Sequence, residues 1–129
     1  MATKRSRRGD RAPSERKHVG MTLPRPVKEQ VVAAAALLEW SVGDWILAVA
    51  AEHGPAVVEL LRGRGVRRRP KVEEATFTAL YLTPDERDEL DDQARSCGLN
   101  RSAFVTAVAQ VGLGEPLEDA VAPLLAPSE

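Results

Sequence analysis

The chain has 129 residues, of which 43% are hydrophobic and only 4% aromatic, and its formal net charge is −1. This length suits one compact domain, or two very small units that share an aliphatic core. No apolar run reaches the roughly 18 residues of a membrane span, and the basic N-terminus lacks the apolar stretch of a secretory signal. The single cysteine, Cys97, excludes an internal disulfide and a multi-cysteine metal site, so we expect a cytoplasmic protein.

The net charge conceals two basic segments in an otherwise acidic chain. Residues 1–17 contain seven basic and two acidic side chains, and residues 62–71 contain six basic and no acidic ones. From Val72 onward there are three arginines and twelve acids. This distribution favours binding to a polyanion, while a flexible tail and a solubilising linker are the plainer interpretation. Residues 1–15 show no apolar periodicity and predict a disordered basic arm.

Residues 16–54 predict a strand followed by two helices. The strand has the period of two that a half-buried strand shows. Its apolar positions alternate with small or polar ones: Val19, Met21 and Leu23 against His18, Gly20 and Thr22. A helix is expected over about 26–38, after the prolines that end the strand. Ser41 then begins a capping-box spacing with Asp44, and the second helix is predicted to end at Gly54.

Residues 55–74 form a basic linker, which can begin with a short helix over 55–61. The order of strand, helix and helix then returns in residues 75–113. In this second strand the alternation predicts that Thr78, Leu80 and Leu82 face one side and that Phe77, Ala79 and Tyr81 face the other.

The second unit has clear helix boundaries. Thr83 caps a helix that begins at Pro84 and runs to about Ser96. Asn100 caps the last helix, which covers about 101–113. The C-terminal tail, 114–129, contains three prolines and at most a short helix over 117–125.

The two units align without a gap when the sequence is shifted by 59 residues. Aligned pairs of similar chemical type include Leu23 with Leu82, Trp40 with Leu99, Ser41 with Asn100 and Trp45 with Phe104. The match predicts two copies of one supersecondary unit. It also favours core packing over base stacking as the role of the two tryptophans.

The chain resembles the ribbon-helix-helix family of DNA-binding proteins. The residues that carry this resemblance are GMTLPRPVKEQVVAAAALLEWSVGDWILAVA (20–50) and ALYLTPDERDELDDQARSCGLNRSAFVTAVA (79–109), roughly half of the chain. The resemblance implies a mainly α fold with short β-strands, in which tandem units pair their strands into a two-stranded antiparallel ribbon. This pairing can occur within one chain, as an intrachain pseudo-dimer, or between each unit and its counterpart in a second chain.

The resemblance also implies sequence-specific binding to double-stranded DNA, with the ribbon in the major groove. The base-contact candidates are the outward strand positions: His18, Gly20, Thr22, Phe77, Ala79 and Tyr81. Apart from Thr22, these residues depart from the family pattern, which generally offers Arg, Lys, Asn, Gln or Thr at such positions. A bulge in the second strand would instead turn Thr76 or Thr78 outward.

Phosphate contacts are expected at the start of each second helix and in the basic segments. Free backbone N–H groups at a helix start and basic side chains both bind anions. The helix-start candidates are Ser41, Val42, Gly43, Asn100, Arg101 and Ser102. The basic candidates are Arg5, Arg7, Arg8, Arg16, Lys17, Arg67, Arg68 and Arg69. Such contacts set the position of a protein on DNA rather than its sequence preference.

Two classes of function stay open. The chain can act as a transcriptional repressor or as a plasmid partition or conjugation accessory factor, associated with the nucleoid or a plasmid, and copies of it can associate with one another on DNA. Alternatively it is an antitoxin-type protein whose C-terminal tail binds a toxin or another protein. Catalysis, a cofactor and a metal site are not expected, because His18 and His53 lack partner ligands and Cys97 lacks a paired histidine.

Overall fold

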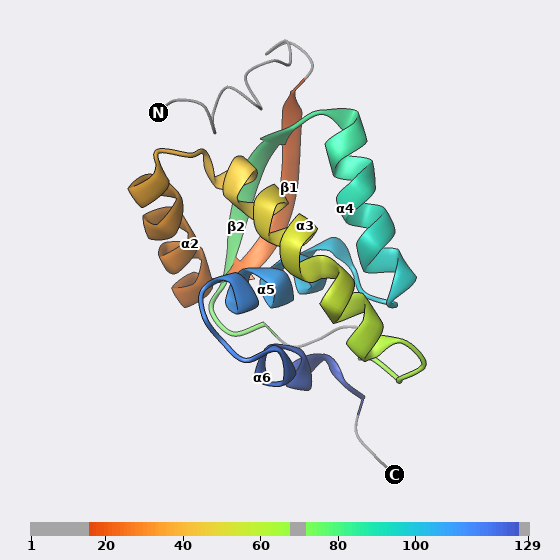
Figure 1. Ribbon diagram of the computed structural model, residues 1–129. Coiled ribbons are helices and arrows are strands. Elements are labelled where there is room, and N and C mark those ends of the chain that lie inside the picture. Colours follow the sequence, from red (N-terminus) through yellow and green to blue (C-terminus); the bar gives the residue numbers. More distant parts are fainter. Residues whose placement is uncertain (1–15, 68–71, 127–129) are drawn as a thin grey trace.

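The computed structural model describes residues 16–67 and 72–126. It is mainly helical and contains one two-stranded antiparallel sheet, as the sequence predicted. The elements follow the order β1 (Lys17–Pro24), α2 (Arg25–Leu38), α3 (Val42–Leu61), β2 (Ala75–Leu82), α4 (Pro84–Ser96), α5 (Arg101–Gly112), α6 (Leu117–Val121) and the 3₁₀ helix η2 (Ala122–Leu124) (Figure 1).

The two strands pair with each other inside the chain. The register runs without a bulge from Lys17 opposite Leu82 to Pro24 opposite Ala75. Thr78 therefore faces inward and is only 4% exposed, so the alternative in which a bulge turns it outward is wrong. The period-2 patterning predicted the buried side of both strands correctly.

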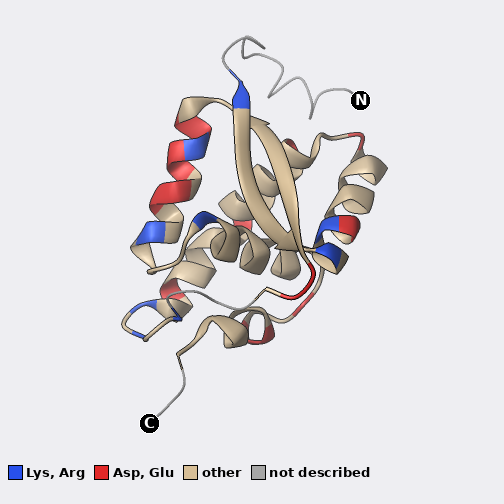
Figure 2. Cartoon of the chain, turned by 180° about the vertical axis from the view of Figure 1, so that it is seen from behind, with Lys and Arg blue, Asp and Glu red and all other residues tan. Residues whose placement is uncertain are grey.

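The helices cover one face of this β1–β2 ribbon. Figure 1 shows α3 crossing in front of the ribbon, with α2 and α4 on either side of it. Figure 2, seen from behind, shows the other face bare of helices. The ribbon thus forms one wall of the molecule, with its inner side in the core and its outer side uncovered.

The core is aliphatic with two large aromatic side chains. The ribbon and α2 contribute Val19, Met21, Leu23, Leu80, Leu82, Val27, Val31 and Ala35. Trp45 in α3 and Phe104 in α5 are buried among them, as the repeat predicted. Trp40 packs against this cluster but is only partly buried.

The predicted caps form at the helix starts. Ser41 accepts a hydrogen bond from the Asp44 N–H, and Asn100 accepts one from the Ala103 N–H. Thr83 forms a full capping box with Glu86. Glu39 ends α2 in the left-handed conformation, with φ 60°.

Helix α3 differs from the prediction, because it continues through Gly54 and Pro55 to Leu61. Gly54 marks a close approach rather than a helix end: a Cβ there would lie 2.5 Å from Gln93 Nε2 and 3.2 Å from Phe104 Cζ. Pro55 removes one backbone donor. The burial of Val57 and Leu61 in the last turns offsets that loss.

The C-terminal segment also differs from a free tail. Ala120, Val121 and Leu124 are buried in the molecule. The segment is joined to the turn after α3 by hydrogen bonds from Arg67 N to Leu124 O and from Ala126 N to Gly65 O. Within the described ranges, the C-terminal residues are therefore a structural part of the fold.

No single helix in the two described ranges is long and apolar enough to cross a membrane; α2 and α3 reach that length and composition only as a pair, with a 98° bend between them.

Candidate nucleic-acid interface

The outer face of the ribbon carries the six side chains that the sequence predicted to point outward. They form three directly opposed pairs, His18–Tyr81, Gly20–Ala79 and Thr22–Phe77. Phe77 and Tyr81 are 66% and 59% exposed, whereas the inward-facing Leu80 and Leu82 of the same strand are each 1% exposed. Such a ribbon has the width that the major groove of B-DNA admits.

His18 and Tyr81 form an aromatic pair near one end of the ribbon. Their rings meet edge to face, with centroids 4.4 Å apart and planes at 69°, an arrangement that ring quadrupoles favour. The His18 Nε2 atom and the Tyr81 hydroxyl share a hydrogen bond. Both side chains are exposed, so this end of the ribbon presents polar groups held in a defined position.

Phe77 covers the centre of the outer face. A Cβ on Gly20 would lie 2.8 Å from Phe77 Cε1 and 3.0 Å from Cζ. The ring therefore lies across the diagonal of the ribbon, in space that only a glycine leaves open. With Ala79 opposite Gly20, the middle of the outer face is apolar.

Both second helices begin against the ribbon, each on the strand of the other unit. At the start of α5, the Ser102 hydroxyl accepts a 2.8 Å hydrogen bond from the Thr22 N–H of β1. At the start of α3, Gly43 is buried against β2, where a Cβ would lie 3.4 Å from the Tyr81 carbonyl oxygen. The helix starts predicted to meet phosphates thus flank the two strands, although Gly43 and Ser102 also serve the packing.

Arg101 has partners inside the protein that the sequence did not reveal. Its Nε and Nη2 atoms donate to the two carboxylate oxygens of Asp91, each at 2.8 Å, and its Nη1 atom donates to the Gly20 carbonyl oxygen at 2.9 Å. The hydrogen bond from Arg101 holds the pKa of the Asp91 carboxyl below its ordinary value. The same bond raises the pKa of Arg101. Arg101 therefore ties α4 and α5 to β1, and its charge is offset by Asp91.

The remaining basic candidates divide by position. Lys17 is exposed at the end of the ribbon where β1 begins (Figure 2), and Arg16 precedes it. Arg67 lies beside the C-terminal segment, where its N–H donates to the Leu124 carbonyl oxygen; Figure 1 shows that α6 lies at the end of the molecule opposite the start of β1. Five candidates lie outside the described residues: Arg5, Arg7, Arg8, Arg68 and Arg69.

Two cations of α2 near the ribbon were missed in the sequence. Lys28 donates from Nζ to the Phe77 carbonyl oxygen at 3.0 Å, and Arg25 forms a 3.6 Å ion pair with Glu74. Lys28 aligns with Arg87 in the 59-residue repeat, and this match of two basic residues was the sequence feature that could have identified Lys28. On the other side of the ribbon, Figure 2 shows the acids of α4, which oppose phosphate there.

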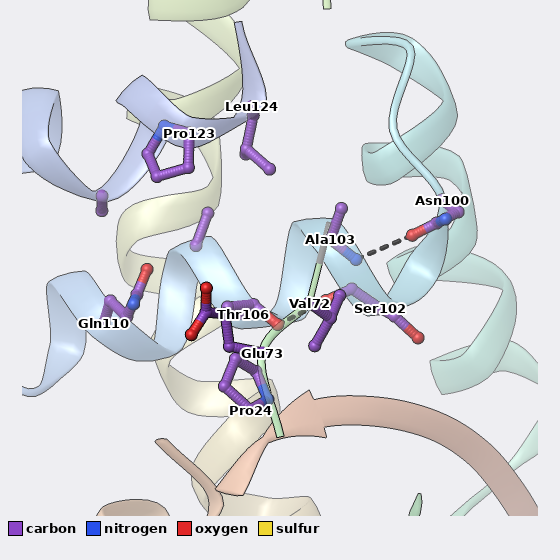
Figure 3. Close-up of a pocket in the computed structure, with 12 residues that line it drawn as sticks. Pro24, Val72, Glu73, Asn100, Ser102, Ala103, Thr106, Gln110, Pro123 and Leu124 are labelled. Atoms are coloured by element: carbon purple, nitrogen blue, oxygen red, sulfur yellow. Dashed lines mark hydrogen bonds between the residues drawn. The ribbon is translucent and has the colours of Figure 1, made fainter. Parts of the chain in front are cut away.

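A pocket of about 320 Å³ lies along α5 (Figure 3). Ser102, Thr106 and Gln110 line it from one side of α5, and Pro24 and Leu124 close it from β1 and the C-terminal segment. Glu73 is the charged side chain in its lining. Ser102 connects the pocket to the ribbon through its bond with Thr22.

The described residues contain no group of three or more His, Cys, Asp or Glu side chains that could hold a metal ion. Cys97 is buried, and burial raises the pKa of its thiol, which disfavours the reactive thiolate.

Comparisons of the chain with models of protein families, with curated proteins and with solved structures found no match.

Proposed function

We propose that the chain is a tandem ribbon-helix-helix protein whose two units pair as an intrachain pseudo-dimer. The spacing of the elements supports this proposal. Helices α2 and α4 begin at Arg25 and Pro84, and helices α3 and α5 begin at Val42 and Arg101, so both pairs are 59 residues apart. Gly20 and Ala79 are separated by the same interval and lie directly opposite each other in the ribbon, at the place where a pseudo-twofold axis would pass.

The function we infer is sequence-specific binding of double-stranded DNA, with the β1–β2 ribbon in the major groove. The observation that carries this inference is the outer face of the ribbon. It is bare of helices and holds three ordered cross-strand pairs, with a helix start beside each strand. Lys17 and Lys28 place cations at the ribbon, where phosphates would pass.

We place this activity in the cytoplasm, on the nucleoid or a plasmid, in repression or in plasmid partition or conjugation. The antitoxin alternative requires a C-terminal segment free to bind a partner. Val121 and Leu124 are buried, so a partner that took this segment would have to remove them from the core. The exposed ribbon is therefore the better candidate surface.

Selection from random DNA duplexes at near-physiological salt tests this function. The best duplex is then titrated against a scrambled duplex, with Thr22→Ala and Tyr81→Ala as ribbon variants and Leu37→Ala as a matched surface control. Loss of the Thr22 hydroxyl group, or of the Tyr81 ring with its hydroxyl group, should each weaken specific binding by at least about fivefold, with little loss of stability. Leu37 is 86% exposed on α2, away from the outer ribbon face, and its variant should bind as the wild type does.

Two results would oppose the proposal. Unchanged specificity in both ribbon variants would reject the ribbon as the reading surface. Equal affinity for selected and scrambled duplexes would show that the chain does not read sequence.

A further inference from the structure

The two strands present different chemistry at positions related by the repeat. His18 corresponds to Phe77, Gly20 to Ala79, and Thr22 to Tyr81. In the ribbon, polar and apolar groups occupy different places. The His18–Tyr81 pair holds polar groups at one end, and the Phe77 ring with Ala79 forms an apolar centre. A homodimeric ribbon would repeat each group on both sides of its axis, whereas this ribbon does not.

The apolar centre restricts what the ribbon can meet in the major groove. The only apolar group on a base edge in that groove is the C5 methyl group of thymine. A cytosine amino group or a guanine O6 atom under the Phe77 ring would lose its water without gaining a partner, and an unpaired polar group is costly. A methyl group in the same place gains from burial.

We propose that the ribbon reads C5 methyl groups of pyrimidines through Phe77 and Ala79, and that its DNA site is non-palindromic because the polar pair lies on one side only. This inference rests on the proposed DNA binding. It adds which chemical group of the bases is recognised and that the ribbon binds its site in one orientation. Thymine and 5-methylcytosine share the methyl group, so both are sources of the signal.

The test replaces single bases in the best selected duplex. Each thymine is changed in turn to deoxyuridine, which keeps the base pair and removes only the methyl group. Each cytosine is changed in turn to 5-methylcytosine, which adds one. The wild type should lose about fourfold in affinity for each methyl group that it buries, at adjacent positions near the centre of the site, where the Phe77 ring and Ala79 lie.

Phe77→Ala and Tyr81→Phe form the matched variants. Phe77→Ala should bind more weakly and should no longer distinguish thymine from deoxyuridine at those positions. Tyr81→Phe keeps its ring and should retain the full response to methyl removal. Phe77 is 66% exposed, and an unchanged thermal unfolding midpoint will show that the variant is folded.

The outcomes distinguish failure of methyl recognition from failure of the proposed sequence-specific DNA binding. A selected duplex that binds equally well with deoxyuridine at every thymine, and with or without cytosine methylation, overturns methyl reading and leaves DNA recognition standing. A selected site that is palindromic overturns the directional part. Failure of any duplex to bind better than scrambled DNA overturns both proposals.

Discussion

At the scale of single residues, Arg101 was predicted to contact phosphate, but its side chain forms hydrogen bonds within the protein. The sequence places it at the start of a helix, where a cation would assist phosphate binding. In the structure Asp91 takes both of its forked donors, and the Gly20 carbonyl takes a third. This bidentate geometry is strong because the guanidinium matches the carboxylate, so Arg101 now positions the centre of the ribbon.

Replacement of Asp91 tests this role through stability. Asp91→Asn should lower the free energy of unfolding by about 1 kcal/mol near neutral pH, because the pair is partly buried. Folding lowers the pKa of Asp91, so its contribution is present above the carboxyl pKa of the unfolded chain and is lost as pH falls through the lower folded value. The difference between wild type and variant should therefore shrink below about pH 4.

The exposed pair of Arg87 with Asp88 supplies the control. It lies on the same helix, with 41% and 62% of the two side chains exposed. Asp88→Asn should change the free energy of unfolding by less than about 0.5 kcal/mol. Equal effects at Asp88 and Asp91 in denaturant titrations would contradict a special role for the Arg101 contact.

At the scale of elements, α3 is the clearest departure from local sequence signals. Glycine followed by proline ordinarily marks the end of a helix. Here Val57 and Leu61 lie beyond that point and are 0% and 1% exposed. Tertiary burial thus extends the helix past residues that would end it in isolation.

Leu61→Ala tests whether the extended part of α3 belongs to the core. We expect a loss of about 3 kcal/mol in the free energy of unfolding, from reduced burial and a residual cavity. Leu37→Ala makes the same chemical change at a residue that is 86% exposed, and should cost less than about 0.5 kcal/mol. Similar losses at both positions would place Leu61 outside the core.

The two first helices differ although they hold matching places in the repeat. Val32 and Leu37 of α2 are exposed apolar residues, and the aligned positions of α4 are Asp91 and Ser96. The inward positions agree in type, such as Val31 with Leu90 and Ala35 with Ala94. The repeat therefore matches the core-facing positions more closely than the exposed apolar ones.

At the scale of the whole molecule, the paired strands make one chain sufficient for one ribbon. Because β1 and β2 pair with each other within the chain, sedimentation velocity should show a folded monomer throughout a dilution series. The thermal unfolding midpoint should also be independent of protein concentration. A dimer that persists at the lowest concentration, with a midpoint that rises with concentration, would reject intrachain pairing.

The basic arm should add affinity without specificity. Its residues 1–15 join the chain immediately before Arg16 and the exposed ribbon end at Lys17. Deletion of these residues should weaken binding to selected and scrambled duplexes alike. The salt slope should fall by about one for every phosphate that the arm neutralises in the wild type. A salt slope that is unchanged after deletion would show that the arm does not meet phosphates.

Much of the fold was readable from short-range patterns. Alternation in β1 and β2 identified the buried and outward sides, and Ser41, Thr83 and Asn100 marked three helix starts. The six outward side chains followed from the same alternation. How they arrange themselves did not follow, because the diagonal contact of Phe77 with Gly20 depends on the strand register.

The sequence alone was enough for the features that depend on residues a few positions apart, such as strand faces and helix caps, and for the 59-residue repeat. Tertiary structure decided the continuation of α3 past Pro55, the pairing of Arg101 with Asp91, and the burial of the C-terminal segment. In each of these cases the deciding partner lies on another element. Free energy from burial and from paired charges then outweighs the local preference of the chain.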